Sequence, residues 1–167
     1  MPLPNDLLEQ AQFLAQREQR RPRQASLRRA VSTAYYAVFH LLAAGAASQA
    51  SLAVPVGLSE RVQRALEHGA MKEAAKRFES GNLPDHIKPL VTNPLPAPLA
   101  AVARSFVRLQ DERHKADYDV SSRFERARAQ NAVALATQLF VDWDSVRNTD
   151  DARVFLASLM FWKLWSK

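Results

Sequence analysis

Residues 26–45, with the sequence SLRRAVSTAYYAVFHLLAAG, form the longest helical pattern in the chain that has two distinct sides. An α-helix turns by about 100° per residue, so apolar residues spaced three and four apart gather on one face. That face contains Leu27, Ala30, Val31, Ala34, Val38, Leu41 and Leu42, and the opposite side contains Arg29, Thr33, Tyr36 and His40. Because the second set can hydrogen-bond and stack, we predict one face in the core and the other facing a partner or a site.

The other periodic segments are also typical of helices, and no stretch shows the alternation of a half-buried strand. The helical patterns cover residues 6–19, 60–67, 70–79, 98–116, 123–146 and about 150–166. We expect N-caps at Asn5 and Ser122, a break at Pro22, and helix ends at Gly69 and Gly81. The predicted fold class is all-α, an up-and-down bundle of about four core helices with short helices and an apolar C-terminal helix.

A length of 167 residues is that of one domain, and we expect a single domain over residues 1–167. Five prolines within residues 81–98 predict a surface connector without regular structure, and residues 51–58 read as a loop. The C-terminal pattern is apolar nearly all round, which predicts burial on more than one side. The bundle itself, a dimer or a binding partner are all candidates to cover it.

The composition excludes several kinds of site. The chain has no cysteine, so disulfides, thiolate nucleophiles and cysteine zinc sites are ruled out. The four histidines are too scattered for a spacing-based metal site, and we expect no cofactor. The N-terminus lacks the pattern of a secretory signal, and no apolar run reaches about 18 residues. These features favour a cytoplasmic protein without a membrane span.

Arginine is concentrated in one short region of this basic chain, whose formal net charge is +6. Residues 17–29 contain Arg17, Arg20, Arg21, Arg23, Arg28 and Arg29, and only Glu18 opposes them. Guanidinium groups match phosphate oxygens in geometry, so Arg20, Arg21, Arg23 and Arg29 are candidate nucleic-acid contacts. The alternative is a solvated connection between two helices.

A second arginine signal lies near the end of the helix predicted for residues 98–116. Arg113 and Asp117 fall on the middle of its apolar face, whereas Arg108 falls on the far side. A guanidinium in that position is costly unless it is paired, and Asp117 is four residues away. Two interpretations remain: a structural ion pair that closes the helix, or a functional arginine held by its carboxylate in a cleft.

Two segments, LRRAVSTAYYAVFH (27–40) and RHKADYD (113–119), together resemble the HEPN superfamily, and within it the small stand-alone bacterial and archaeal proteins. The first segment has Ser32, Ala34, Tyr35, Tyr36, Ala37 and Phe39 in register. The resemblance covers about residues 6–146 in helical pattern but only these two segments in residues. It implies a dimerising helical bundle, and many members are metal-independent ribonucleases or toxins, often paired with a nucleotidyltransferase antitoxin or found in defence systems.

The resemblance also implies site residues. The family motif is an arginine, usually a polar residue, and a histidine after a gap of four to six residues. Arg113 matches the arginine and His114 takes the polar position, but Asp117 and Tyr118 stand near the place of the histidine. Arg108 and His114 have a suitable spacing, yet a helix would direct them about 120° apart.

Cleavage of RNA by its own 2′-hydroxyl would need a base, an acid and a cation on the phosphorane. Arg113 would hold the phosphate, His114, His40 or Tyr118 would transfer protons, and Tyr36 would position the nucleotide. Two functions remain open. One is a HEPN-like protein directed at RNA, either a ribonuclease or a degenerate relative. The other is a non-catalytic homodimeric module that docks a protein such as a nucleotidyltransferase. We further predict that Tyr36 and His40 lie near Arg113, across a groove or a dimer seam.

Overall fold

The computed structural model describes residues 2–50 and 58–165, and all regular structure within these ranges is helical, as predicted. The α-helices are α1 (Leu3–Gln16), α2 (Gln24–Ala50), α3 (Leu58–Ala65), α4 (His68–Ser80), α5 (Ala97–Tyr118), α6 (Arg126–Val146) and α7 (Asp150–Trp165). A short 3₁₀ helix, η1, spans Lys88–Leu90.

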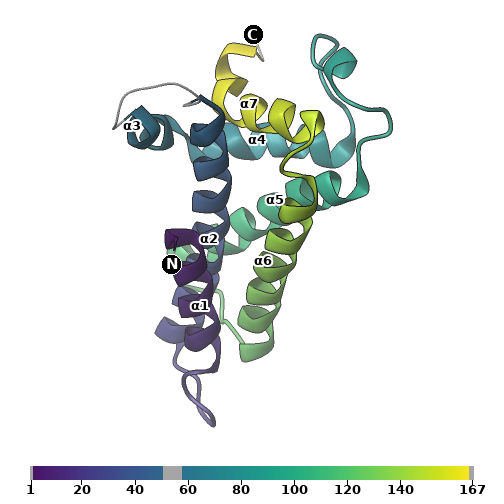
Figure 1. Cartoon of the computed structure of the whole chain (residues 1–167). Helices are drawn as coiled ribbons and strands as arrows, with labels where there is room; N and C mark the ends of the chain where they lie inside the picture. Colours follow the sequence, from purple (N-terminus) through teal and green to yellow (C-terminus); the bar gives the residue numbers. More distant parts are fainter. Residues whose placement is uncertain (1, 51–57, 166–167) are drawn as a thin grey trace.

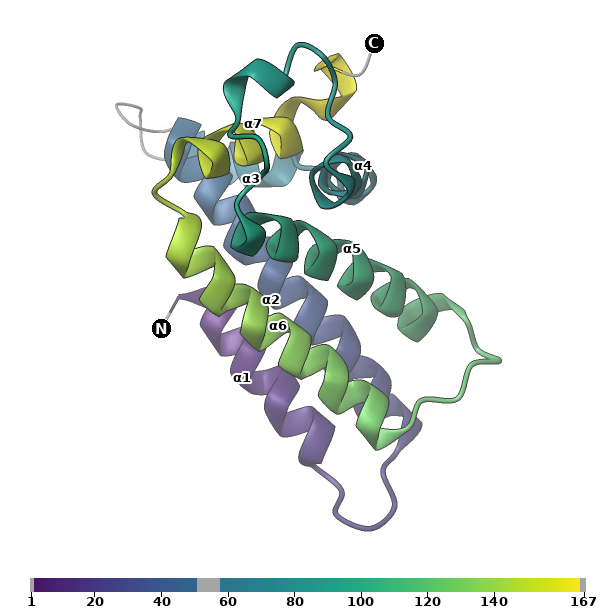
Figure 2. The same ribbon diagram turned by 90° about the vertical axis from the view of Figure 1, so that its right-hand side faces the viewer.

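Four helices, α1, α2, α5 and α6, pack side by side as a bundle in which successive members run in opposite directions (Figure 2). Helices α4 and α7 lie across one end of this bundle and pack on each other, and α3 lies beside the end of α2 (Figure 1). The predicted all-α helical bundle is therefore confirmed. The core runs through both parts, because α2 extends along the bundle and reaches α7.

Helix α2 is the central element, and it buries more than the predicted apolar face, because Thr33 of the predicted polar side and Tyr35 are also buried. Ala30, Val31 and Ala34 have no exposed surface, while Leu41 at the edge of the face is only half-buried. By length and hydropathy alone, residues 24–49 would also suit a membrane span, the one such segment among the described residues. Because 72% of the most apolar window is buried inside the protein, the other helices already cover this apolar surface.

Several helix boundaries differ from the prediction. Helix α1 begins at Leu3, with Pro2 rather than Asn5 at the N-cap. The reason is that the fixed φ of Pro4 suits the first turn of a helix and its side chain is buried there. Gly69 does not end a helix but lies in the first turn of α4, after a break at residues 66–67 where Leu66 turns into the core. Gly81 ends α4 as predicted, with a left-handed φ of 69°.

Helix α6 begins at Arg126, and the predicted cap at Ser122 is wrong. The reason is a set of contacts that hold residues 119–125 outside a helical conformation. Asp119 Oδ1 accepts hydrogen bonds from the backbone nitrogens of Ser121 and Ser122, at 3.0 and 3.2 Å. The side-chain amide of Gln24 donates to Phe124 O at 2.7 Å and accepts from Phe124 N at 2.9 Å. The hydroxyl of Ser122 accepts instead from Arg128.

The proline-rich segment, residues 81–98, runs over the surface with η1 as its one regular turn before α5 begins at Ala97. It is anchored, because Leu83 and Ile87 are buried and Thr92 N donates to Asp151 at 2.7 Å. The predicted loop at residues 51–58 lies outside the described residues except for Leu58, which begins α3.

The apolar C-terminal helix, α7, buries one broad face rather than several sides, and the cover of that face comes from within the chain. It packs on α4 and α2, and the ring of Phe155 meets that of Phe78 at 5.0 Å between centroids. Thr149 caps its first turn by accepting from Ala152 N at 3.2 Å. Phe161 and Leu164 on its outer side remain exposed.

Candidate functional site

Arg113 extends the apolar face of α5 toward α2, where its side chain is only 15% exposed. Its Nη2 donates a hydrogen bond to the hydroxyl of Tyr36 at 2.8 Å. Its Nε lies 2.8 Å from Asp117 Oδ2, but the N–H is not directed along this line, so the contact is an ion pair rather than a hydrogen bond. The structure thus contains the predicted pair with Asp117 and the predicted contact with Tyr36, within one chain.

Three tyrosine rings surround the guanidinium of Arg113. Its Cζ lies 5.5 Å from the ring centres of Tyr36 and Tyr118 and 5.8 Å from that of Tyr35. Burial favours the neutral guanidinium, but the hydrogen bond to Tyr36 and the nearby Asp117 outweigh it and raise the pKa of Arg113. The site therefore holds a permanent cation among aromatic faces, which stabilise it further.

The two sequence segments that carry the HEPN resemblance meet at this point. Ser32, which is 1% exposed on α2, donates a hydrogen bond from its hydroxyl to the carboxylate of Asp117 on α5. Asp117 therefore binds Arg113 on its own helix and Ser32 on the neighbouring one. This arrangement fixes the end of α5 against α2 and explains why both segments need polar residues on otherwise buried faces.

His68, the first residue of α4, belongs to the same cluster and was not found from the sequence. Its Nδ1 lies 2.6 Å from the hydroxyl of Tyr35, and its ring stacks on Phe39 at 4.2 Å between centroids. Burial is the largest cause that lowers the pKa of His68, followed by the charges of Arg113 and His40. Burial likewise raises the pKa of Tyr35, whose hydroxyl stays protonated. No spacing rule connects residues that are 45 positions apart, such as His68 and Arg113.

The polar stripe of α2 faces a groove along α1, which we call the α2 groove. One part, of about 430 Å³, is lined by Leu3, Leu7, Gln10, Leu14, Arg29, Thr33, Tyr36 and His40. A second part, of about 400 Å³, is lined by Leu3, Phe39, His40, Gln63, Arg64, Leu66 and His68. Leu3 and His40 line both parts, so the two parts are adjacent, one on the Arg29 side and one on the His68 side. Tyr36 connects it to Arg113, because its ring lines the groove and its hydroxyl accepts from the guanidinium.

Other predicted site residues lie around this centre in different ways. Tyr118 is 62% exposed beside Arg113, and the exposed His114 places its ring 5.0 Å from that of Tyr118. His40 lies in the α2 groove with His68, where burial lowers its pKa, and it makes no direct contact with Arg113. Arg108 lines a separate pocket between α5 and α6. The structure therefore does not bring Arg108 and His114 together as a motif.

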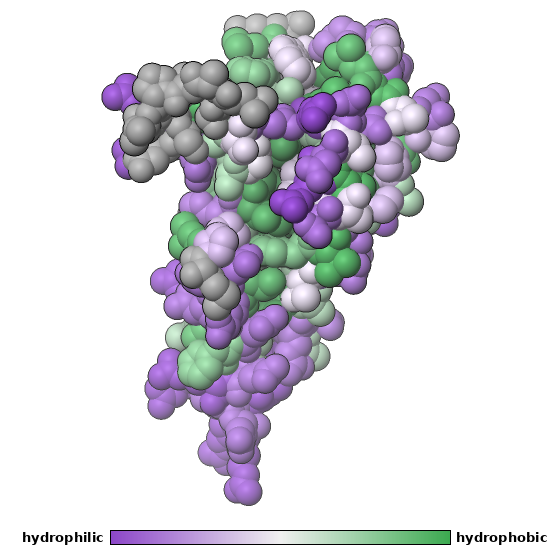
Figure 3. Space-filling model, in the orientation of Figure 1, coloured by the Kyte–Doolittle hydropathy of each residue, from purple (hydrophilic) through white to green (hydrophobic). Residues whose placement is uncertain are grey.

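The arginines of the α1–α2 connection divide into structural and exposed groups. Arg28 donates to the carbonyl oxygens of Ala116 and Asp119, both at 2.9 Å, and so closes the end of α5. Arg20, Arg21 and Arg23 are exposed in the connection. This connection forms the lower tip of the molecule, and the surface there is hydrophilic (Figures 1 and 3). Arg29 lies apart from them in the α2 groove.

The described residues contain no group of three or more histidine, aspartate or glutamate side chains placed to hold a metal ion. No protein-family model, curated protein or solved structure matches this chain. The HEPN resemblance thus depends on the two sequence segments, and it stays a prediction.

Proposed function

We propose that this chain is a HEPN-like protein that binds RNA along the α2 groove, with Arg113 as a phosphate-contacting residue. The observation that carries the proposal is the placement of Arg113, a nearly buried guanidinium that Tyr36 and Asp117 hold beside a surface groove. An arginine with fixed orientation presents its remaining donors to a phosphate at a small entropic cost.

The groove offers chemistry that suits a polynucleotide beyond this single contact. Arg29 and Arg64 contribute positive charge along its length, and the half-buried Tyr36 contributes aromatic surface. Aromatic rings stack on unpaired bases, while guanidinium groups contact the backbone. The exposed tip arginines, Arg20, Arg21 and Arg23, extend the basic surface beyond the groove at the Arg29 end of α2. A cytoplasmic location is part of the same proposal.

The test is RNA binding by fluorescence anisotropy, with one change in the site and one matched change outside it. Arg113→Ala is expected to weaken binding by about tenfold or more, because a charge-assisted phosphate contact contributes about 1.5–3 kcal/mol. Arg104→Ala is the control, because Arg104 is on the same helix and its side chain is 52% exposed. Its ion pair with Glu79 is long, at 3.9 Å, so its removal should change the fold little. Equal affinity for the two folded variants would contradict the proposal.

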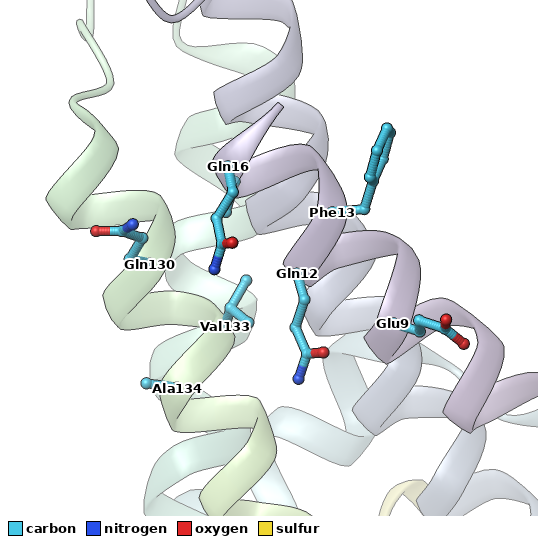
Figure 4. A pocket seen from close by; sticks show the side chains of 8 residues that line it. Glu9, Gln12, Phe13, Gln16, Gln130, Val133 and Ala134 are labelled. Atoms are coloured by element: carbon cyan, nitrogen blue, oxygen red, sulfur yellow. The ribbon is translucent and has the colours of Figure 1, made fainter. Parts of the chain in front are cut away.

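A second candidate function is a homodimeric interaction module, and one surface favours it. Phe13 on α1, the helix that packs against α6, is 64% exposed. Between these helices lies a pocket of about 510 Å³, into which Gln12 and Gln16 turn while Phe13 projects outward from α1 (Figure 4). Exposed large apolar side chains are typical of interfaces. The occupant would be a second copy of the chain or a protein such as a nucleotidyltransferase.

Light scattering at micromolar concentration tests this second candidate. A homodimer that uses this surface should dissociate when Phe13→Glu introduces a charge, while Phe161→Glu on the outer side of α7 should leave it intact. A monomeric wild-type protein would count against the homodimer.

A further inference from the structure

The α2 groove contains two histidines that the family spacing does not indicate. We propose that His68 and His40 form the proton-transfer pair of a ribonuclease site in which Arg113 is the cation on the phosphate. This inference rests on the proposed function, since it adds cleavage to RNA binding at the same groove.

The first support is the position of the two imidazoles. His40 from α2 and His68 from α4 line the same pocket of about 400 Å³. The rings of Tyr35 and Tyr36, which lie 5.8 and 5.5 Å from the guanidinium of Arg113, lie 5.7 and 6.1 Å from the ring of His68. A base, an acid and a cation around one phosphate are the groups that attack by a 2′-hydroxyl requires.

The second support is the orientation of His68. Its Nδ1 is engaged by the hydroxyl of Tyr35 at 2.6 Å, and its ring is stacked on Phe39. When Nδ1–H donates to the tyrosine oxygen, the lone pair of the imidazole is on Nε2, the nitrogen left for a substrate. A base oriented by a third group in this way is a recurring feature of catalytic sites. Tyr35 is thus a positioning residue.

Burial lowers the pKa values of both histidines. The groups around His68 are Tyr35, Tyr36 and His40 of α2, Arg64 of α3 and Arg113 of α5, and the Lys72–Asp111 ion pair lies one turn further along α4. Burial, Arg113 and His40 all lower the pKa of His68, whereas burial alone lowers that of His40. The contact with Tyr35 leaves Nε2 of His68 for the substrate, so we assign His68 as the base and His40 as the acid.

The reaction step follows from this assignment. Nε2 of His68 accepts the proton of the 2′-hydroxyl, and the 2′-oxygen forms a bond to phosphorus. The bond between phosphorus and the 5′-oxygen breaks, and the 5′-oxygen receives the proton of the His40 imidazolium. The products are a 2′,3′-cyclic phosphate and a 5′-hydroxyl, and proton exchange with water restores both histidines. Arg113 neutralises the charge that develops on the phosphorane.

The experiment measures cleavage and binding separately on an end-labelled, unstructured RNA. His68→Asn keeps an amide nitrogen where Nδ1 meets Tyr35 but removes Nε2, and His40→Ala removes the acid. Each variant is expected to lose about 100-fold or more in cleavage rate, while its RNA affinity changes by less than about threefold. His86→Ala in the proline-rich segment is the matched control and should cleave at the wild-type rate. His114→Ala on α5 is measured as well, because His114 is the competing candidate for proton transfer.

Further readouts separate catalysis from a structural role. The product must carry a 2′,3′-cyclic phosphate, and an RNA with 2′-deoxynucleotides throughout must bind without being cleaved. The rate should peak at a pH below 6.5, because both histidines have lowered pKa values and one must be protonated. Tyr35→Phe should shift this profile without abolishing binding.

The outcomes distinguish this inference from the function on which it rests. RNA that is bound but not cleaved by the wild-type protein overturns the histidine pair and leaves the proposed function standing. Cleavage that survives both histidine changes, or that requires His114, also overturns the histidine pair and leaves the proposed function standing. If the folded Arg113→Ala variant binds RNA as tightly as the wild type, the proposed function is overturned, and the histidine pair with it.

Discussion

Tyr36 on α2 accepts a hydrogen bond from Arg113 on α5, although the two residues are 77 positions apart in the sequence. This contact joins the groove along α1 to the cation at the end of α5. It makes the fold and the candidate site depend on each other, because the bond that orients the guanidinium also attaches α5 to α2.

Tyr36→Phe removes this bond but keeps the ring. We expect a loss of about 1–3 kcal/mol in the free energy of unfolding, the usual range when a charged group loses a hydrogen-bond acceptor. Urea denaturation followed by circular dichroism measures it. Tyr118→Phe is the matched control, since Tyr118 is 62% exposed and meets Arg113 through its ring, and it should change stability by less than about 0.5 kcal/mol.

Arg28 and Arg29 are adjacent but have opposite expected roles. Arg28 donates to the carbonyl oxygens of Ala116 and Asp119 and lies over the ring of Phe124, so Arg28→Ala should cost about 2–4 kcal/mol of stability. Arg29 is exposed in the groove, so Arg29→Ala should leave stability nearly unchanged and weaken RNA binding. Paired melting curves and anisotropy titrations check both, and equal loss of stability would contradict the distinction.

Stability should fall in mild acid because of His68 and His40. Their folded pKa values lie below the ordinary value of 6.5, so the unfolded chain binds more protons once the pH falls through 6.5. Their contribution is complete above pH 6.5 and is lost as the pH drops toward the folded pKa values. The measurement is urea unfolding at pH 7.5 and 5.5. The difference between these two pH values should shrink when His68→Asn and His40→Ala are combined, and an unchanged difference would contradict the assignment.

Two glycines provide a matched test of the backbone. Gly81 has φ of 69° after α4, so Gly81→Ala should destabilise the protein by about 1–2 kcal/mol despite open space around it. Gly69 lies in the first turn of α4 with no atom near the position of a Cβ, so Gly69→Ala should be neutral or stabilising by up to about 1 kcal/mol. In thermal melts the melting temperature should fall for Gly81→Ala and should stay the same or rise for Gly69→Ala.

The sequence predicts the parts of this fold that follow from local periodicity. The buried face of α2 and the position of Arg113 both follow from helical spacing, because burial selects side chains every three or four residues. The end of α4 follows from Gly81, because a left-handed residue needs glycine. In each case the physical cause lies within one or two turns of the residue concerned.

The failed predictions depend on partners that are distant in the sequence. The expected cap at Ser122 is absent because Gln24 clamps the backbone of Phe124 from 100 residues away. The role of His68 appears only when the first residue of α4 reaches the hydroxyl of Tyr35 on α2, and a lone histidine carries no periodic signal. For α7 the apolar pattern predicts burial but not the covering element, which is α4 together with α2.

The central claim is that Arg113 contacts RNA phosphate, and the affinity of Arg113→Lys for RNA tests it most directly. Lysine keeps the positive charge and the ion pair with Asp117 but loses the planar fork of donors. The proposal predicts a folded variant, destabilised by no more than the loss of about 1–3 kcal/mol expected for Tyr36→Phe, whose RNA affinity falls about tenfold at fixed salt. A folded Arg113→Lys protein that binds RNA as tightly as the wild type would contradict it and leave Arg113 and Asp117 as a structural ion pair.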